Sequence, residues 1–178
     1  MALQGTGKHT VQNVVVLGSV STDVGFSIQS HNNSVSGNTV FGAEGGGFNV
    51  SGSNNILQQN TTVGGNFMFY VAVTGEGNQL TGNVATGGEY AYYVEGSNNV
   101  FVQNWVSGSG FWVLGSGKST DSEHGNTWRR HFNTGESNII ENNVALGNSG
   151  DLQDGNTNCD SNVWQNNIFQ TSNQACIQ

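Results

Sequence analysis

An asparagine phrase that returns about every 22 residues constrains this chain more than any other feature. The phrase is an Asn, an apolar residue two positions later and a second Asn three positions after that, as in Asn33-Ser-Val-Ser-Gly-Asn38. Successive first asparagines are 22, 23, 21, 39 and 24 residues apart; they are Asn33, Asn55, Asn78, Asn99, Asn138 and Asn162. A repeat of this length with a fixed internal pattern is typical of a solenoid.

Short segments of alternating apolar and polar residues follow the phrase in the regular copies. They begin at Phe48, Val71, Tyr92 and Trp112, and Gly, Ser and Asn flank them. This alternation indicates half-buried strands, and no stretch has helical periodicity. We therefore predict an all-β fold, a right-handed single-stranded parallel β-helix (solenoid) of about seven coils of about 22 residues.

One domain is expected over residues 1–178, a length that suits a single continuous core. Residues 1–32 form an irregular first coil, residues 33–117 the regular coils, residues 118–137 a loop insertion and residues 138–178 the C-terminal coils.

The second asparagine of each phrase is expected to have a structural role. Stacked at a corner of the solenoid, each amide can bond the backbone or the amide of the next coil. The residues in this position are Asn38, Asn60, Asn83, Asn104, Asn143 and Asn167.

Charge argues against two classes of partner. The chain has 12 acidic residues against four Lys and Arg, a formal net charge of −8, so no basic stripe is present to bind nucleic acid. The sequence contains neither an 18-residue apolar run nor the apolar core of a signal peptide near Met1. We expect no nucleic-acid partner and no membrane partner.

Two cysteines, Cys159 and Cys176, both fall in the last repeat. A disulfide there would secure the chain end and contribute about 3 kcal/mol by the chain-entropy estimate. The alternative is a pair of free buried thiols. If the cysteines are paired, an oxidising compartment follows.

The repeats resemble the right-handed parallel β-helix repeat proteins of the pectate-lyase-like superfamily, over residues 33–117 and 138–178. The ending, from Asp151-Leu-Gln-Asp-Gly-Asn to Cys176-Ile, is similar to the C-terminal coil of secreted bacterial members. The resemblance implies this fold, a secreted or cell-surface location, and a polysaccharide or cell-surface glycan as partner. The Asn-Thr-Asp, Gly-His-Gly and Arg-Ile-Lys stretches of the family's pectin hydrolases do not occur here.

The loop insertion holds the first candidate site, because insertions in solenoids often form the binding face. Catalysis on an acidic sugar needs a base and cations that offset the carboxylate. The catalytic candidates are Lys118, Arg129, Arg130 and His131. The alternative is a solvated loop that pairs its own charges.

Strand parity gives the second candidate site. If Phe48 and Val50 point inward, the alternation places Tyr70, Tyr93 and Phe111, with Glu95, on one outer face. Exposed aromatic rings are typical of interfaces and sugar-stacking surfaces. A register error of one residue would place the three rings in the core instead.

We expect no metal site and no cofactor, since no Cys, His or carboxylate set has ligand spacing. The preferred function is binding of carbohydrate or another surface partner without catalysis. The alternatives are a small polysaccharide lyase or epimerase acting on uronate-containing glycans, and a structural or self-assembling spacer. Self-association is expected through the end coils or the aromatic face.

Overall fold

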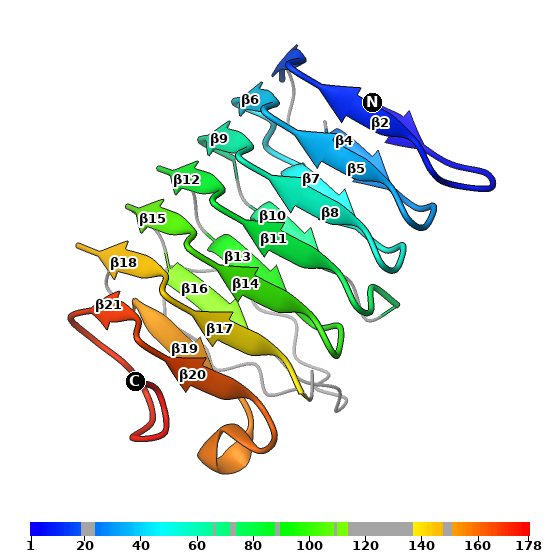
Figure 1. The fold of residues 1–178 in the computed structure, drawn as a ribbon. Helices are drawn as coiled ribbons and strands as arrows, with labels where there is room; N and C mark the ends of the chain where they lie inside the picture. The colour runs from blue at the N-terminus through cyan, green and yellow to red at the C-terminus, as the bar shows by residue number, and fades with distance from the viewer. Residues whose placement is uncertain are drawn as a thin grey trace, which may run out of the picture.

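The computed structural model describes residues 1–18, 24–65, 67–71, 74–87, 90–108, 110–113, 137–147 and 151–178. The protein is all-β, with parallel strands stacked as a β-solenoid (Figure 1). The strands form three sheets of seven, and each strand pairs with the equivalent strands one turn before and after it. This confirms the predicted fold class.

We refer to the three sheets as A, B and C. Sheet A contains β1 (Ala2–Leu3), β4 (Val24–Ile28), β7 (Gly46–Val50), β10 (Phe67–Val71), β13 (Tyr90–Val94), β16 (Gly110–Val113) and β19 (Leu152–Asp154). Sheet B contains β2 (Thr10–Gln12), β5 (Ser34–Ser36), β8 (Ile56–Gln58), β11 (Gln79–Thr81), β14 (Val100–Val102), β17 (Ile139–Glu141) and β20 (Val163–Gln165). Sheet C contains β3 (Val15–Leu17), β6 (Thr39–Phe41), β9 (Thr61–Val63), β12 (Val84–Thr86), β15 (Trp105–Ser107), β18 (Val144–Leu146) and β21 (Ile168–Phe169). A short 3₁₀ helix, η1 (Thr157–Cys159), precedes β20.

A rung is one strand from each sheet in chain order. The solenoid has about five turns, fewer than the seven that the repeat spacing predicted. The end rungs are reduced: β1 and β21, at opposite ends of the stack, have two residues each.

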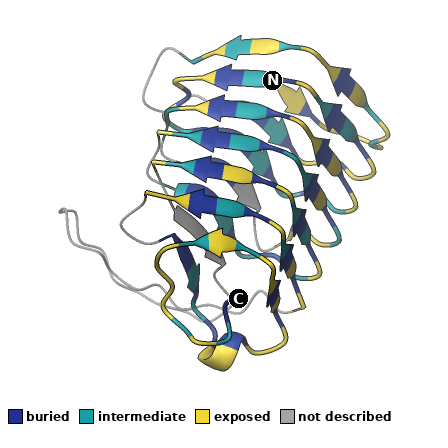
Figure 2. Ribbon diagram, turned by 60° about the vertical axis from the view of Figure 1, so that its left-hand side comes forward, coloured by how far each residue is buried: buried dark blue, intermediate teal, exposed yellow. Residues whose placement is uncertain are grey.

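The interior is built of successive layers, and Figure 2 shows its buried positions repeating from rung to rung. The apolar residue inside each Asn phrase is buried in every copy: Val35, Leu57, Leu80, Phe101, Ile140 and Trp164. Under sheet A the rings of Phe26, Phe48, Phe69 and Tyr92 stack face to face, with centroids 4.8 to 5.0 Å apart. This spacing follows the strand spacing of about 4.8 Å, so the core propagates along the axis with the backbone.

Both corners that flank sheet B need a left-handed residue just before the ladder asparagine. Before Asn38 and its equivalents stand Gly37, Gln59, Gly82, Gln103, Asn142 and Asn166, with φ between 53° and 64°. Glycine and asparagine adopt this conformation most easily, and the corner leads the chain from sheet B into sheet C within two residues.

The second asparagines form a buried ladder, as predicted. In Asn83, for example, Oδ1 accepts hydrogen bonds from the backbone N–H of Asn60 (2.9 Å) and from its Nδ2 (3.1 Å). Nδ2 of Asn83 donates to the carbonyl of Leu57 (3.0 Å) and to Oδ1 of Asn104 (3.1 Å). Each amide thereby satisfies backbone groups that the bend leaves outside the sheet ladders.

The first asparagines form a second ladder, which the sequence reasoning did not predict. Oδ1 of Asn55 accepts from the N–H of Asn33 at 2.9 Å, and Oδ1 of Asn99 accepts from the N–H of Asn78 at 2.9 Å. This ladder crosses the 39-residue interruption without a break, since the N–H of Asn99 donates to Oδ1 of Asn138 at 2.8 Å. Sheet B is therefore held between two amide columns.

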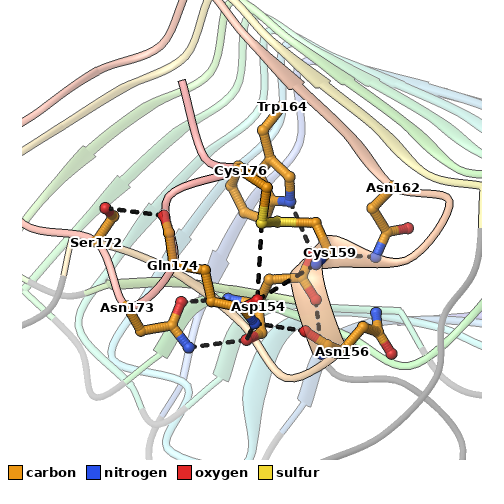
Figure 3. Close-up of a disulfide and its surroundings, with 9 residues drawn as sticks. All are labelled: Asp154, Asn156, Cys159, Asn162, Trp164, Ser172, Asn173, Gln174 and Cys176. Atoms are coloured by element: carbon orange, nitrogen blue, oxygen red, sulfur yellow. Dashed lines mark hydrogen bonds between the residues drawn. A yellow bond between two sulfur atoms is a disulfide. The ribbon is translucent and has the colours of Figure 1, made fainter.

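The C-terminal end of the stack is capped, and a disulfide joins Cys159 to Cys176 (Figure 3). This confirms the predicted pairing and excludes the alternative of two free thiols. Buried Asp154 ends the first ladder: its carboxylate accepts from Nδ2 of Asn162 (3.2 Å) and from Nε1 of Trp164 (2.7 Å). Asp151 is also buried, and it accepts the backbone N–H groups of residues 170 and 171.

Among the described residues, no helix has the length and apolar character that a membrane crossing requires.

Candidate ligand-binding face

Three aromatic side chains lie together on the outside of sheet A. Phe67 lies at the start of β10, and Tyr90 and Tyr93 lie on the neighbouring strand β13. All three are half-buried, whereas the rings at Phe69 and Tyr92 are fully buried on the other side of the same strands. We call Phe67, Tyr90 and Tyr93 the aromatic face.

The three rings pack in a fixed arrangement. Phe67 and Tyr90 stack with centroids 5.1 Å apart and planes within 11° of parallel. Tyr93 meets both edge-on, with centroids 5.2 Å from Phe67 and 5.6 Å from Tyr90. Such T-shaped and stacked contacts are the preferred geometries of aromatic pairs and hold the rings in place. The face is therefore preorganised.

A local departure from strand alternation creates this face. In β13 both Ala91 and Tyr92 are fully buried, and in β10 both Met68 and Phe69 are. Two consecutive inward residues leave the residue before them and the residue after them outside, so positions three apart share the outer surface. Tyr90 and Tyr93 have this spacing.

Residues without side chains flank the stacked pair. Phe67 and Tyr90 are paired in register, and Gly110 is paired with Tyr90. On the preceding strand β7, Gly46 stands two residues before Phe48, as Phe67 stands two residues before Phe69, the partner of Phe48. Gly46 has φ of 140°, and a Cβ there would lie 3.2 Å from the carbonyl oxygen of Phe67. A larger residue at 46 would crowd the backbone that carries Phe67.

Tyr93 holds its phenol proton more firmly than an exposed tyrosine does. Partial burial raises the pKa of Tyr93 to about 12, with smaller contributions from the nearby carboxylate of Glu95 and from Tyr90. The phenol is therefore a hydrogen-bonding group without charge at physiological pH. Glu95 lies two residues after Tyr93 and is half-buried.

The backbone register tests the predicted placement of the outer aromatics. Tyr70 pairs with Tyr93 and with Asn49, so these three residues share one column. Phe111, in contrast, pairs with buried Tyr92 and buried Leu152, and Trp112 takes the position opposite Tyr93. In the backbone register Phe111 therefore stands one position away from the column of Tyr70 and Tyr93. The cause is a register shift between Tyr90 and Tyr92, where β13 has one more residue than β16.

Sequence reasoning missed Phe67 and Tyr90. It placed the strand of that coil at residues 71–73, whereas β10 spans Phe67–Val71. It also assumed strict alternation, which put Ala91 outside. A signal was available: the aromatic pair Phe67 and Tyr90 is 23 residues apart, close to the repeat length.

The catalytic candidates Lys118, Arg129, Arg130 and His131 lie outside the described residues. Within the described part of the chain, no group of three or more His, Cys, Asp or Glu side chains is placed to hold a metal ion. The chemistry of the aromatic face is that of a contact surface: rigid ring faces, phenol hydroxyls and one neighbouring carboxylate.

No family model matches the chain, and neither curated proteins nor solved structures gave a match. The resemblance to the pectate-lyase-like superfamily is therefore a prediction that no relative confirms. The geometry alone assigns the protein to the parallel β-solenoids, with two buried asparagine ladders and one disulfide.

Proposed function

We propose that the protein binds carbohydrate through the aromatic face without catalysing a reaction. The observation that carries this proposal is the packed set of Phe67, Tyr90 and Tyr93 on an outer surface where the fold itself does not need aromatic rings. At the same two columns, the preceding rungs carry Val24, Ser27 and Asn49. Rigid aromatic faces supply apolar contact area at low entropic cost, and phenol groups add hydrogen bonds to hydroxyls.

Charge selects among sugars. Glu95 adjoins the aromatic face, and the formal net charge of the chain is −8. Uronates and sulfated sugars would meet like charge, which raises the cost of binding and slows their approach. The proposed ligand is therefore a neutral glycan, and amino sugars are the next best fit.

The proposed location is the cell surface or the extracellular medium. The disulfide supports an oxidising compartment, since such bonds persist there and are rare in the cytosol. Glycans are abundant at cell surfaces and in the extracellular medium, so a glycan-binding protein would meet its ligand there.

The test begins with a glycan array that contains neutral, acidic and amino sugars. The strongest soluble oligosaccharide is then titrated calorimetrically against wild type, Tyr90→Ala and Trp105→Ala. Trp105 is an exposed aromatic residue on sheet C, so it controls for loss of any surface ring. We expect Tyr90→Ala to weaken binding by about tenfold or more and Trp105→Ala to leave it unchanged. Equal affinity in all three proteins contradicts the proposal.

A further inference from the structure

The outer face of sheet C has no charged residue, although the chain has a formal net charge of −8. All seven strands of this sheet are described, and their polar residues are limited to Thr and Ser. Seven of the eleven large hydrophobic side chains that are exposed in the described residues lie here, among them Val15, Leu17, Phe41, Trp105 and Ile168. Sheet B has three of the others, interspersed with Gln, Ser and Glu141.

One border of this face is smooth. A glycine with φ between 60° and 81° follows each of five successive strands of sheet C: Gly42, Gly64, Gly87, Gly108 and Gly147. At these five positions the border itself has no side chain. A flat partner can therefore approach the strands closely, to the distance of about 10 Å at which two sheets pack.

We propose that the outer face of sheet C docks a second copy of this chain. Two copies that each carry −8 repel each other through charged surfaces, and a face without charge minimises this repulsion. A strongly basic partner would gain nothing from contact with uncharged side chains. The self-association expected from the sequence involves the end coils or the aromatic face; sheet C is a different surface.

The area is sufficient for a weak dimer. Seven strands at about 4.8 Å make the face about 30 Å long, and the strands with their glycine border make it roughly 15 Å wide. Two such faces bury about 1,000 Å² in total, which is the lower limit for specific interfaces. Association should therefore be reversible and dependent on concentration.

A twofold axis gives the two faces complementary shapes. If the axis runs parallel to the strands through β12, rungs at equal distances from β12 face each other across the interface. Trp105 on β15 then faces Thr61 on β9, and Phe41 on β6 faces Leu146 on β18. The largest side chain of the face meets a small one.

Sedimentation equilibrium over a range of protein concentrations tests the proposal. We expect wild type to form a dimer that becomes tighter with added salt, because salt screens the repulsion between the copies. Phe41→Glu should raise the dimer Kd at least about a hundredfold, since the symmetry buries two carboxylates. Ile56→Glu is the matched control on sheet B, because Ile56 is 44% exposed and Phe41 42%. It should change the Kd by less than about threefold.

Three results would overturn the proposal: a wild type that is monomeric at every concentration, a dimer that persists in Phe41→Glu, or equal dissociation by Ile56→Glu. A reversible unfolding transition checks that each variant is folded. Leu17→Glu, at a position that is 74% exposed, repeats the test if Phe41→Glu does not fold. Glycan titration of the monomer measures binding at the aromatic face and does not involve sheet C. A negative result for the dimer therefore leaves the proposed function untouched, and the reverse also holds.

Discussion

The asparagine ladders and the aromatic face use repetition in opposite ways. Along the second ladder the same residue occupies every rung from Asn38 to Asn167, and it makes equivalent bonds each time. The aromatic face covers two neighbouring strands, and other residues stand at the same columns elsewhere, such as Ser27 and Gln153. In a solenoid, a residue that every rung repeats serves the fold, and a cluster confined to a few rungs is free to serve a ligand.

The largest expected effect is on the ladder. Asn83→Ala leaves the backbone N–H of Asn60 and the carbonyl of Leu57 unpaired in the interior. We expect the free energy of unfolding to fall by about 3–5 kcal/mol, since each unsatisfied buried group costs about 1–3 kcal/mol. Urea denaturation measures the loss. Gln58→Ala, which removes an exposed amide on sheet B, is the control and should stay within about 0.5 kcal/mol of wild type.

The next largest effect is expected at the C-terminal cap, where the disulfide, which the repeat does not contain, stabilises the fold. Reduction of Cys159–Cys176, or replacement of both by Ser, opens a loop with a sequence separation of 17 residues. The chain-entropy model predicts a loss of about 3 kcal/mol. Thermal unfolding with and without reductant measures it, and the double Ser variant should be insensitive to reductant. An unchanged thermal midpoint would show that the hydrogen bonds at the ends of the asparagine ladders hold the cap in place without the disulfide.

A smaller effect, in the opposite direction, concerns Thr62 in the core under sheet C. Its column is otherwise apolar, with Val40 and Ala85 on the neighbouring rungs, and its Oγ1 has no hydrogen-bond partner among the described residues. Thr62→Val removes a buried unsatisfied hydroxyl at nearly constant shape, and should raise the free energy of unfolding by about 1 kcal/mol. A decrease in the urea midpoint would mean that the hydroxyl has a partner.

The smallest effect is the titration of Tyr93. Its folded pKa of about 12 lies above the unfolded value of about 10, so the unfolded chain loses this proton first as pH rises. The contribution of Tyr93 to stability is therefore complete below about pH 10 and is lost as pH rises through 12. Absorbance titration of wild type minus Tyr93→Phe isolates this group from Tyr92, whose pKa burial also raises. A difference curve centred near pH 10 would contradict a packed ring.

The sequence predicted the repeating part of the fold because repetition encodes it. Each Asn phrase specifies a corner, and each apolar residue within it a core position, so the solenoid, the second ladder and the structural role of its asparagines all followed. The first asparagines recur with the same periodicity, but only the second asparagine of each phrase was expected to stack on its equivalents. The cysteine pair was predictable because Cys159 and Cys176 lie in one coil.

Sequence reasoning missed Phe67 and Tyr90 in the aromatic face, because alternation fails within β10 and β13, where two consecutive residues are buried. Tyr70 and Tyr93 share one column of the backbone register, while Ala91 and Tyr92 are two consecutive buried residues within β13. One residue less in β16 then shifts Phe111 into the column of Tyr92. Such one-residue differences depend on how the backbones of neighbouring rungs pack, and they cannot be predicted from the repeat pattern of one sequence.

The contrast between ladder and face is tested most directly by the affinity of one neutral oligosaccharide for Tyr93→Ala and Asn83→Ala, compared with wild type. Both variants are measured at a temperature where unfolding curves show them folded. We expect Tyr93→Ala to lose about tenfold or more in affinity at little cost in stability, and Asn83→Ala to lose stability but to bind as wild type does. Wild-type affinity in Tyr93→Ala would contradict this contrast.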